Sequence, residues 1–170
     1  MLALRPMTEA DYPAIVNILN EVVRTGKQIA YTEEFTVAER AAWFADHQSP
    51  DYPIYVAETD DAVVGWVSLS AYRPGREALK HTVEISYGVK ASMRRKGVGS
   101  AMVAKMLEVA RERGHRIVFA IIFDNNSASR GLLRKYSFEK WGHLPDVALL
   151  NGTLLGHVYL GLRLDSISPR

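Results

Sequence analysis

The residues best suited to do chemistry form a basic loop in the middle of the chain, Arg94-Arg95-Lys96-Gly97-Val98-Gly99-Ser100. Its two glycines let backbone N–H groups approach an oxyanion closely. Three cationic side chains lie beside the glycines, and the residues that follow have a helical pattern, so the positive end of a helix dipole is expected behind the loop. Together these groups predict a site that stabilises the pyrophosphate of a cofactor.

Two common phosphate-binding motifs do not fit this loop. A dinucleotide-binding loop needs a small residue where this chain has Met102, and a Walker loop needs Gly-Lys followed by Ser or Thr at its end. The pattern that remains is Arg94-x-x-Gly97-x-Gly99. The alternative is a basic turn that merely precedes a helix. The elements on either side of the loop distinguish this alternative from a phosphate-binding site.

An amphipathic helix is expected directly after the loop, because apolar residues recur there at helical spacing. Gly114 is expected to end this helix as a left-handed cap. A short strand that begins at Glu84 precedes the loop, and the continuous apolar run Ile117 to Ile122 predicts a strand covered on both faces. The order is therefore strand, loop, helix, strand. The helix residues expected in the core are Met102, Val103, Met106, Leu107 and Ala110.

The remaining elements follow from periodicity and turn residues. A helix from about Asp11 to Thr25 ends at Gly26, and Thr36 with Glu39 forms a capping box for a second helix. Strand and hairpin signals, among them the turn Asn151-Gly152, account for most of the rest. The expected segments are a strand at 2–5, the second helix at 37–46 with Ala41, Trp43 and Phe44 packed, strands at 54–58 and 63–72 joined across Asp60-Asp61, strands at 147–150 and 153–162, and a loose tail at 165–170. The strand that precedes the basic loop is expected to start near Thr82, shortly before Glu84.

Composition limits the classes of protein that this chain could belong to. Its 170 residues, 48% of them hydrophobic, predict a single domain over residues 1–170. The chain has no cysteine, which excludes disulfides, thiolate zinc sites and cysteine nucleophiles. An early polar start and the lack of an apolar run of about 20 residues predict a cytoplasmic protein without a membrane span. With a net charge of only +2 and mixed signs along the chain, a nucleic-acid partner is not expected.

With these elements in place, the loop pattern resembles the acyl-CoA loop of the GNAT superfamily of N-acetyltransferases, whose members carry Gln or Arg at its first position. The order of elements matches that superfamily over nearly the whole chain. Within it, the chain looks most like the phosphinothricin and methionine sulfoximine acetyltransferases. The residues that carry this likeness are Ala41-Ala42-Trp43-Phe44, Tyr72-Arg73-Pro74, Thr82-Val83-Glu84, Asn126-Ser127-Ala128-Ser129 and Phe138-Glu139-Lys140-Trp141-Gly142.

The resemblance implies an α/β (α+β) fold with a mixed, mostly antiparallel sheet that is flanked by helices and split at the acyl-CoA site. It also implies a homodimer and acetyl-CoA as co-substrate, with the pantetheine arm along the strand and the loop on the pyrophosphate. No metal is expected, because His143 and His157 lack ligand spacing. Asn126 would contact the pantetheine, cap a helix, or do both. The implied cofactor-binding residues are Tyr87, Val89, Arg94, Arg95, Lys96, Gly97, Val98, Gly99, Ser100, Asn126 and Ser129.

Catalytic roles are likewise implied by the resemblance. Glu84 stands where phosphinothricin-type enzymes place a proposed general base, and it would take the amine proton directly or through water if burial raises its pKa. The alternative is an ordinary solvated glutamate. The chain departs from its relatives at Leu133, where they carry a tyrosine or histidine acid, and at Ser137, where they carry glycine. A thiolate is a fair leaving group unaided, and Tyr87 and Tyr136 are either substitute acids or packing aromatics.

The acyl acceptor is expected between the loops at 27–35 and 71–80. Tyr31, Glu33 and Phe35 would line a pocket, and Arg73 would either clamp a carboxylate or cap the turn at 74–75. The expected activity is acetyl transfer to the amine of a small molecule, such as an amino acid or an analogue. Two alternatives stay open, namely acetylation of a protein N-terminus or lysine, and a non-catalytic acyl-CoA sensor, which Leu133 would suit.

Overall fold

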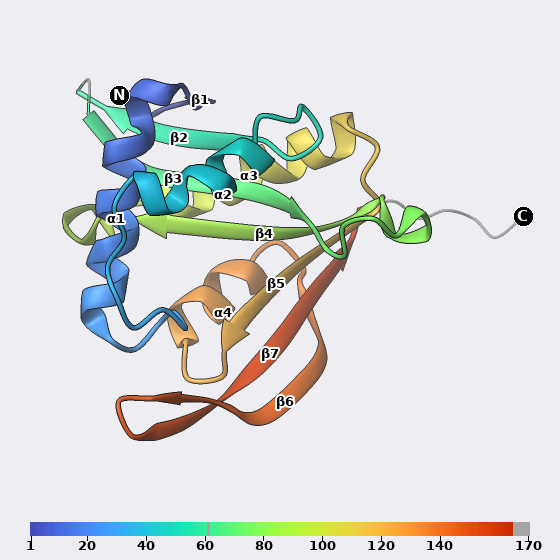
Figure 1. The fold of residues 1–170 in the computed structure, drawn as a ribbon. Coiled ribbons are helices and arrows are strands. Elements are labelled where there is room, and N and C mark those ends of the chain that lie inside the picture. Colours follow the sequence, from blue (N-terminus) through green and yellow to red (C-terminus); the bar gives the residue numbers. More distant parts are fainter. Residues whose placement is uncertain (61, 165–170) are drawn as a thin grey trace, which may run out of the picture.

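The computed structural model describes residues 1–60 and 62–164, which form one sheet with helices on both faces (Figure 1). The expected tail at 165–170 and Asp61 of the expected hairpin turn lie outside these residues. The elements are β1 (Ala3–Pro6), α1 (Tyr12–Thr25), α2 (Ala41–Asp46), β2 (Ile54–Thr59), β3 (Ala62–Ala71), β4 (Thr82–Val89), α3 (Val98–Glu112), β5 (Ile117–Phe123), α4 (Ser127–Arg134), β6 (Glu139–Leu150) and β7 (Thr153–Arg163).

The strands are arranged in the order β1-β2-β3-β4-β5-β7-β6. Every neighbouring pair is antiparallel except β4 and β5, which run parallel. A parallel pair needs a long crossover connection, and here α3 supplies it. The mixed, mostly antiparallel sheet expected from the sequence is therefore confirmed.

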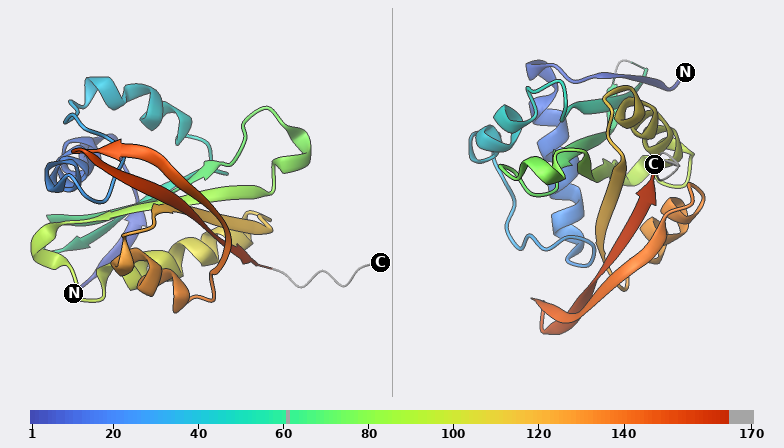
Figure 2. Two further views of the ribbon diagram at one scale, coloured as in Figure 1. Left: turned by 90° about the horizontal axis from the view of Figure 1, so that it is seen from below. Right: turned by 90° about the vertical axis from the view of Figure 1, so that its right-hand side faces the viewer.

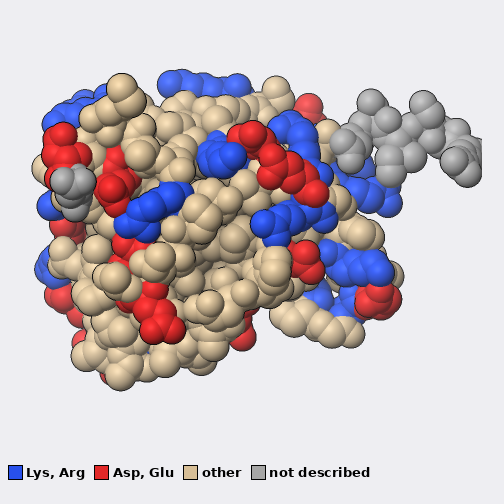
Figure 3. Space-filling model, turned by 90° about the horizontal axis from the view of Figure 1, so that it is seen from above, with Lys and Arg blue, Asp and Glu red and all other residues tan. Residues whose placement is uncertain are grey.

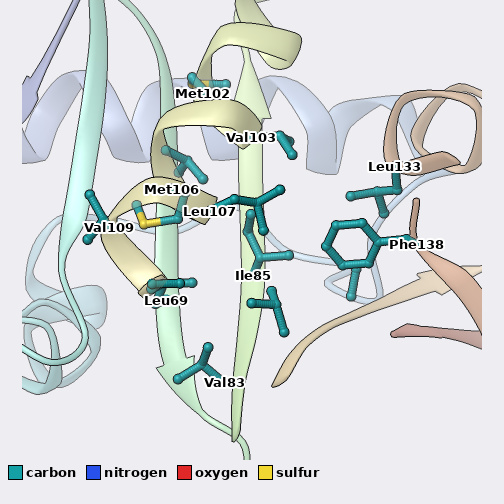
Figure 4. Close-up of a cluster of buried hydrophobic side chains, with 14 of the residues drawn as sticks. Leu69, Val83, Ile85, Met102, Val103, Met106, Leu107, Val109, Leu133 and Phe138 are labelled. Atoms are coloured by element: carbon teal, nitrogen blue, oxygen red, sulfur yellow. The ribbon is translucent and has the colours of Figure 1, made fainter. Parts of the chain in front are cut away.

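Helices α1 and α2 cover one face of the sheet, and α3 and α4 cover the other (Figure 2). The larger core lies under α3. Its apolar face packs on β3 and β4, and Leu133 from α4 and Phe138 close one side of the cluster (Figure 4). The expected core residues of this helix are all buried, namely Met102, Val103, Met106, Leu107 and Ala110.

Strand β5 is covered less completely than its apolar sequence predicts. Val118 and Ala120 are buried against the α3 core, whereas Ile117, Phe119, Ile121 and Ile122 are partly exposed. The expectation of a strand covered on both faces is wrong for these four residues. For Ile121 and Ile122 the physical reason is that they line an open cleft, described below, and an apolar run alone does not reveal a cleft.

The segment around α2 also differs in detail from its prediction. The capping box is present, because the Glu39 carboxylate accepts from the Thr36 backbone N–H at 2.7 Å and Thr36 Oγ1 accepts from the Glu39 N–H. However, a short 3-10 turn precedes α2, and Arg40 at the junction has φ −96° and ψ 3°. Phe44 is buried as expected, but Ala41 is exposed.

The C-terminal hairpin turns at Asn151-Gly152 as the sequence predicts. Both residues have positive φ, 50° and 77°, which is the geometry of a type I′ turn. Strand β6 begins at Glu139, earlier than the expected Val147. Two register irregularities in β6 break the alternation of apolar and polar residues, so the pattern did not reveal its first half.

Ser137 closes α4 in a conformation that favours glycine. Its φ is 63°, its N–H donates to the Arg134 carbonyl, and the Phe138 N–H donates to the Leu133 carbonyl. These two bonds form a Schellman motif in which the left-handed residue is usually glycine. The glycine that relatives carry here thus has a conformational reason.

Replacing Ser137 with Gly should therefore raise the free energy of unfolding by about 1 kcal/mol, because the left-handed strain disappears. The matched control is Ser129→Gly inside α4, which should lower it by about 0.5 kcal/mol. Urea denaturation midpoints measure both changes. A destabilised Ser137→Gly variant would contradict this account of the α4 terminus.

Candidate functional site

The sheet divides between β4 and β5. These two strands pair only from Thr82 to Glu84 on β4 and from Ile117 to Phe119 on β5. Beyond these positions β5 continues to pair with β7, while β4 stays with β3, and the ribbons diverge (Figure 1). Among the described residues, one edge of β4 from Ser86 to Val89 therefore has no neighbouring strand. Backbone groups on this edge can pair with an extended ligand, although the Val89 carbonyl already accepts from Arg94 Nε at 3.3 Å.

A cleft of about 1160 Å³ fills this division. Its walls come from the open part of β4, the end of β5, the loop before α3, the N-terminal half of α4 and the loop before α2. Of the eleven expected cofactor residues, nine line the cleft and two, Lys96 and Val98, do not. The nine are Tyr87, Val89, Arg94, Arg95, Gly97, Gly99, Ser100, Asn126 and Ser129.

The basic loop forms one end of this cleft. Gly97 is the N-cap of α3, with φ 87°, and no side chain caps the helix there. The first N–H groups of α3, from Val98 onward, have no partner within the helix, so they are available to an anion together with the positive end of the dipole. Arg95 also has positive φ, 60°. The loop is thus built to hold an anionic group on backbone amides.

The N-terminus of α4 faces the loop across the cleft. The Asn126 side chain accepts from the Ser129 N–H at 3.0 Å, so Asn126 caps α4, which is one of the two roles expected for it. Tyr136, at the end of α4, donates to the Ser100 carbonyl at 2.6 Å and its hydroxyl lies 2.8 Å from Ser100 Oγ. Tyr136 therefore braces α4 against the first turn of α3 and does not line the cleft.

Glu84 lies where β4 and β5 part, and it lines the cleft. Burial raises the pKa of its carboxyl above the ordinary value. The residue paired with Glu84 on the neighbouring strand β3 is Ser70, and the Ser70 hydroxyl lies 3.0 Å from His47 Nε2. Because His47 Nδ1 lies 2.7 Å from the Trp43 carbonyl, Nδ1 carries the proton and Nε2 accepts from Ser70. Glu84 is thus a half-buried carboxyl on a partly polar face, where it can act as a proton acceptor.

Tyr87 and Leu133 occupy the opposite face of β4. Leu133, the residue that departs from the resembled family, is fully buried in the α3 core (Figure 4). The Tyr87 side chain packs against this core, and its hydroxyl is buried with no hydrogen-bond partner among the described residues. Burial raises the pKa of the Tyr87 phenol, an effect that nearby Ser129 partly offsets. Tyr87 therefore lines the cleft, and its protonated hydroxyl is buried beside Ser129.

The residues expected to hold the acceptor are only partly brought together. Tyr31 lines the cleft, and its ring meets that of Phe35 edge-on at 4.8 Å. Phe35 stands behind it, with its backbone held by the Asn20 side chain at 2.8 and 2.9 Å. Glu33 is exposed, and Arg73 is exposed with its guanidinium 5.7 Å from the Tyr72 ring centre. Neither Glu33 nor Arg73 lines the cleft.

The residues lining the cleft that the sequence analysis missed include Arg40, Trp43 and Trp66. The spacing of Arg40 and Trp43, three residues apart in a helical segment, was a signal that they share a face. The approach of Trp66 had no such signal. It depends on Gly88 opposite, where an added Cβ would come within 2.7 Å of Trp66 Nε1.

Other kinds of site find little support over the described residues 1–60 and 62–164. No group of His, Cys, Asp and Glu there could hold a metal ion. No helix in that part of the chain is long and apolar enough to cross a membrane. On the face drawn in Figure 3, acidic and basic side chains are interspersed.

Comparison with known proteins gives consistent matches. A family model described as an acetyltransferase (GNAT) domain matches residues 1–139. An L-methionine sulfoximine/L-methionine sulfone acetyltransferase of Pseudomonas aeruginosa is 34% identical, over 96% of this chain and 95% of that protein. An L-amino acid N-acyltransferase of Escherichia coli is 29% identical over 96% and 95%. The crystal structure of a phosphinothricin acetyltransferase from Sinorhizobium meliloti with AcCoA has a TM-score of 0.90 and 28% identity, and covers 95% of this chain and 88% of that one.

We expect Glu84 to titrate above 4.5 in the free protein and exposed Glu39, held by the Thr36 N–H, to titrate below 4.5. NMR titration of the side-chain carboxyl carbons measures both.

Because the Glu84 pKa is raised on folding, the stability that Glu84 contributes is complete below pH 4.5 and is lost as the pH rises through the folded pKa. Glu84→Gln should therefore be more stable than the wild type near pH 7, and this gain should vanish below pH 4.5. A Glu84 pKa at or below that value would refute the burial argument.

Proposed function

The chain belongs to the GNAT family of N-acetyltransferases, and from this premise we propose that it moves the acetyl group of acetyl-CoA to the amine of an amino acid or a close analogue. The observation that carries the proposal is the cleft between β4 and β5, with a basic glycine loop at one end and a half-buried carboxyl of raised pKa, Glu84, within it. The names of the relatives, which act on methionine sulfoximine, phosphinothricin or amino acids, support the acceptor class.

The chain offers suitable groups for each part of the co-substrate. The amides of the first turn of α3, with Arg94 and Arg95 beside them, bind the pyrophosphate. Space around Gly97 is open, since an added Cβ would meet no atom of the described residues within 4 Å, so the ligand can reach the backbone. The unpaired edge of β4 from Ser86 to Val89 pairs with the amides of the pantetheine arm. This places the thioester near the point where the strands part.

Glu84 is the general base of the proposed reaction. An amino acid presents a protonated amine, and the amine must lose a proton before its nitrogen can attack the acetyl carbon. Glu84 takes this proton directly or through a water molecule, and its raised pKa makes it a better base than an exposed glutamate. Attack is direct, since orientation of two bound reactants can supply roughly 7 to 11 kcal/mol. A backbone N–H near Val89 stabilises the oxyanion.

Tyr87 assists the leaving group. When the carbon–sulfur bond breaks, the electron pair stays on sulfur, and the thiolate accepts a proton or a hydrogen bond from the Tyr87 hydroxyl, which is protonated and lies beside Ser129. This role is open because Leu133 provides no acid and Tyr136 is engaged with Ser100. A thiol pKa near 8.5 makes the help useful and not essential.

Two finer proposals concern the state of the protein. We propose that it is a homodimer, because apolar side chains of the β6–β7 hairpin are exposed, and that it acts in the cytoplasm. Sedimentation equilibrium tests the homodimer, and a monomer at micromolar concentration would contradict it. Cell fractionation tests the location, and recovery outside the cytoplasm would contradict it. The exposed hairpin side chains are Trp141, Leu144, Val147, Leu149 and Leu154.

A second candidate function, a non-catalytic acyl-CoA sensor, is favoured only by the burial of Leu133. Acetylation of a protein chain is disfavoured by the aromatic residues that narrow the acceptor end, among them Tyr31, Trp43 and Trp66. Thiol release from acetyl-CoA, measured with a panel of amines and with peptides, separates the three functions. Release that needs no amine would contradict the transferase proposal.

Substitutions at Glu84 and Tyr87 should separate the two proton transfers. Glu84→Gln should lower kcat by about 10²- to 10⁴-fold, the usual contribution of a general base. Tyr87→Phe should lower it by about 10-fold, since the thiolate can leave unaided. Dissociation constants for coenzyme A, measured by calorimetry, should change less than about threefold in both variants. Full activity of Glu84→Gln would remove Glu84 from the mechanism.

Gly97→Ala should weaken coenzyme A binding by about 10-fold or more, because a left-handed alanine distorts the loop that presents the amides. Gly75→Ala is a matched control. Gly75 also has positive φ, 76° against 87° for Gly97, and neither has an atom within 4 Å of an added Cβ, but Gly75 does not line the cleft. Both variants should lose about 1 kcal/mol of stability. Equal coenzyme A affinity in the two variants would disprove the role of the loop.

A further inference from the structure

Arg40 lies at the acceptor end of the cleft with an unusual set of neighbours. Its guanidinium carbon is 4.5 Å from the ring centre of Trp43, 5.1 Å from that of Phe35 and 5.7 Å from that of Tyr31. These three rings come from α2 and from the loop before it, and they surround a single cation. Cation–π contacts of this kind stabilise the charge and hold its plane in place.

No acidic side chain of residues 1–60 and 62–164 pairs with this cation. Arg40 takes part in no ion pair among the described residues, although Arg5, Arg24, Lys80 and Lys105 all do. Its Nε is buried and has no hydrogen-bond partner in that part of the chain. Leaving a buried donor of a charged group unpaired is costly, so an arrangement of this kind favours an anion from outside the chain.

The walls around Arg40 are fixed by their own contacts. The Trp43 ring meets the Trp66 ring edge-on at 5.5 Å. Asn20 of α1 holds the Phe35 backbone through two hydrogen bonds. Arg24 of α1 forms an ion pair at 2.7 Å with Glu34 of the same loop. The guanidinium is therefore preorganised, and its half-buried position among aromatic rings removes part of its contact with water. Both conditions strengthen binding of a carboxylate or a similar anion.

Arg40 and Glu84 line the same cleft with opposite charges, Arg40 from the helical side and Glu84 from the sheet. A zwitterionic amino acid carries the complementary pair, an ammonium and a carboxylate two bonds apart on one carbon. We propose that Arg40 binds the carboxylate of the acceptor and so restricts the enzyme to amines that carry an anionic group. This inference rests on the proposed function, and it assigns to Arg40 the role that the sequence suggested for Arg73.

The test compares α-amino acids with their α-carboxamides, which keep the amine and lose the negative charge. For the wild type, kcat/KM should favour the acid by about 100-fold, the scale of a desolvated charge pair. In Arg40→Gln this preference should fall to about threefold or less, through a higher KM for the acid, with kcat/KM for the carboxamide and KM for acetyl-CoA nearly unchanged. Arg40→Lys, which keeps the charge but loses the planar fork, should retain an intermediate preference.

Arg73→Gln is the matched control, since Arg73 is an exposed arginine outside the cleft, and its preference for the acid should equal that of the wild type. The proposal is overturned if Arg40→Gln keeps the preference, if Arg73→Gln loses it, or if Arg40→Gln reduces acid and carboxamide equally. The last result would mean that Arg40 only braces the aromatic rings. Melting curves show whether each variant is folded. If Arg40→Gln does not fold, the test rests on Arg40→Lys, whose preference for the acid should be lower than that of the wild type. A wild type that acetylates no amine at all would overturn the proposed function and this inference together.

Discussion

The structure depends on one feature of the sheet, the point after Glu84 and Phe119 where β4 and β5 stop pairing. If the two strands stayed together, the edge of β4 would be satisfied and the cleft would close. Because they part, the edge of β4 beyond Glu84 has no neighbouring strand among the described residues, and the N-termini of α3 and α4 both line the gap. A site for an extended, anionic thioester is therefore a direct consequence of the sheet topology.

The two faces of β4 supply different chemistry at this point. On the face toward α1 and α2, Glu84 lies near Ser70, and Arg40 is held among aromatic rings, so the polar groups suit a charged acceptor. On the face toward α3, the Tyr87 hydroxyl is buried beside Ser129, and Leu133 belongs to the core. In the proposed mechanism, acceptor activation and departure of the thiolate therefore come from opposite sides of one strand. The loss of an acid at position 133 is compatible with catalysis for this reason.

Local patterns in the sequence predicted the parts of the fold that are locally determined. The α3 core face, the turn at Asn151-Gly152 and the left-handed Gly114 all follow from spacing or backbone preference. The sequence did not predict the early start of β6, where bulges interrupt the alternation, or the partial exposure of β5 along the cleft. The position of Arg40 among Tyr31, Phe35 and Trp43 depends on how a loop folds back on a helix, which no local spacing encodes. Arg73 is a loop arginine of the expected type, but it lies outside the cleft.

Hydrogen–deuterium exchange of the full chain, with and without acetyl-CoA, tests the central claim most directly, because it reports on the backbone amides that the gap leaves free. Peptides that cover Ser86 to Val89 and Gly97 to Ala101 should gain protection when acetyl-CoA is added, while peptides from the β6–β7 turn should not change. Unchanged exchange at β4 and at the start of α3 under saturating acetyl-CoA, or protection confined to other elements, would contradict the account.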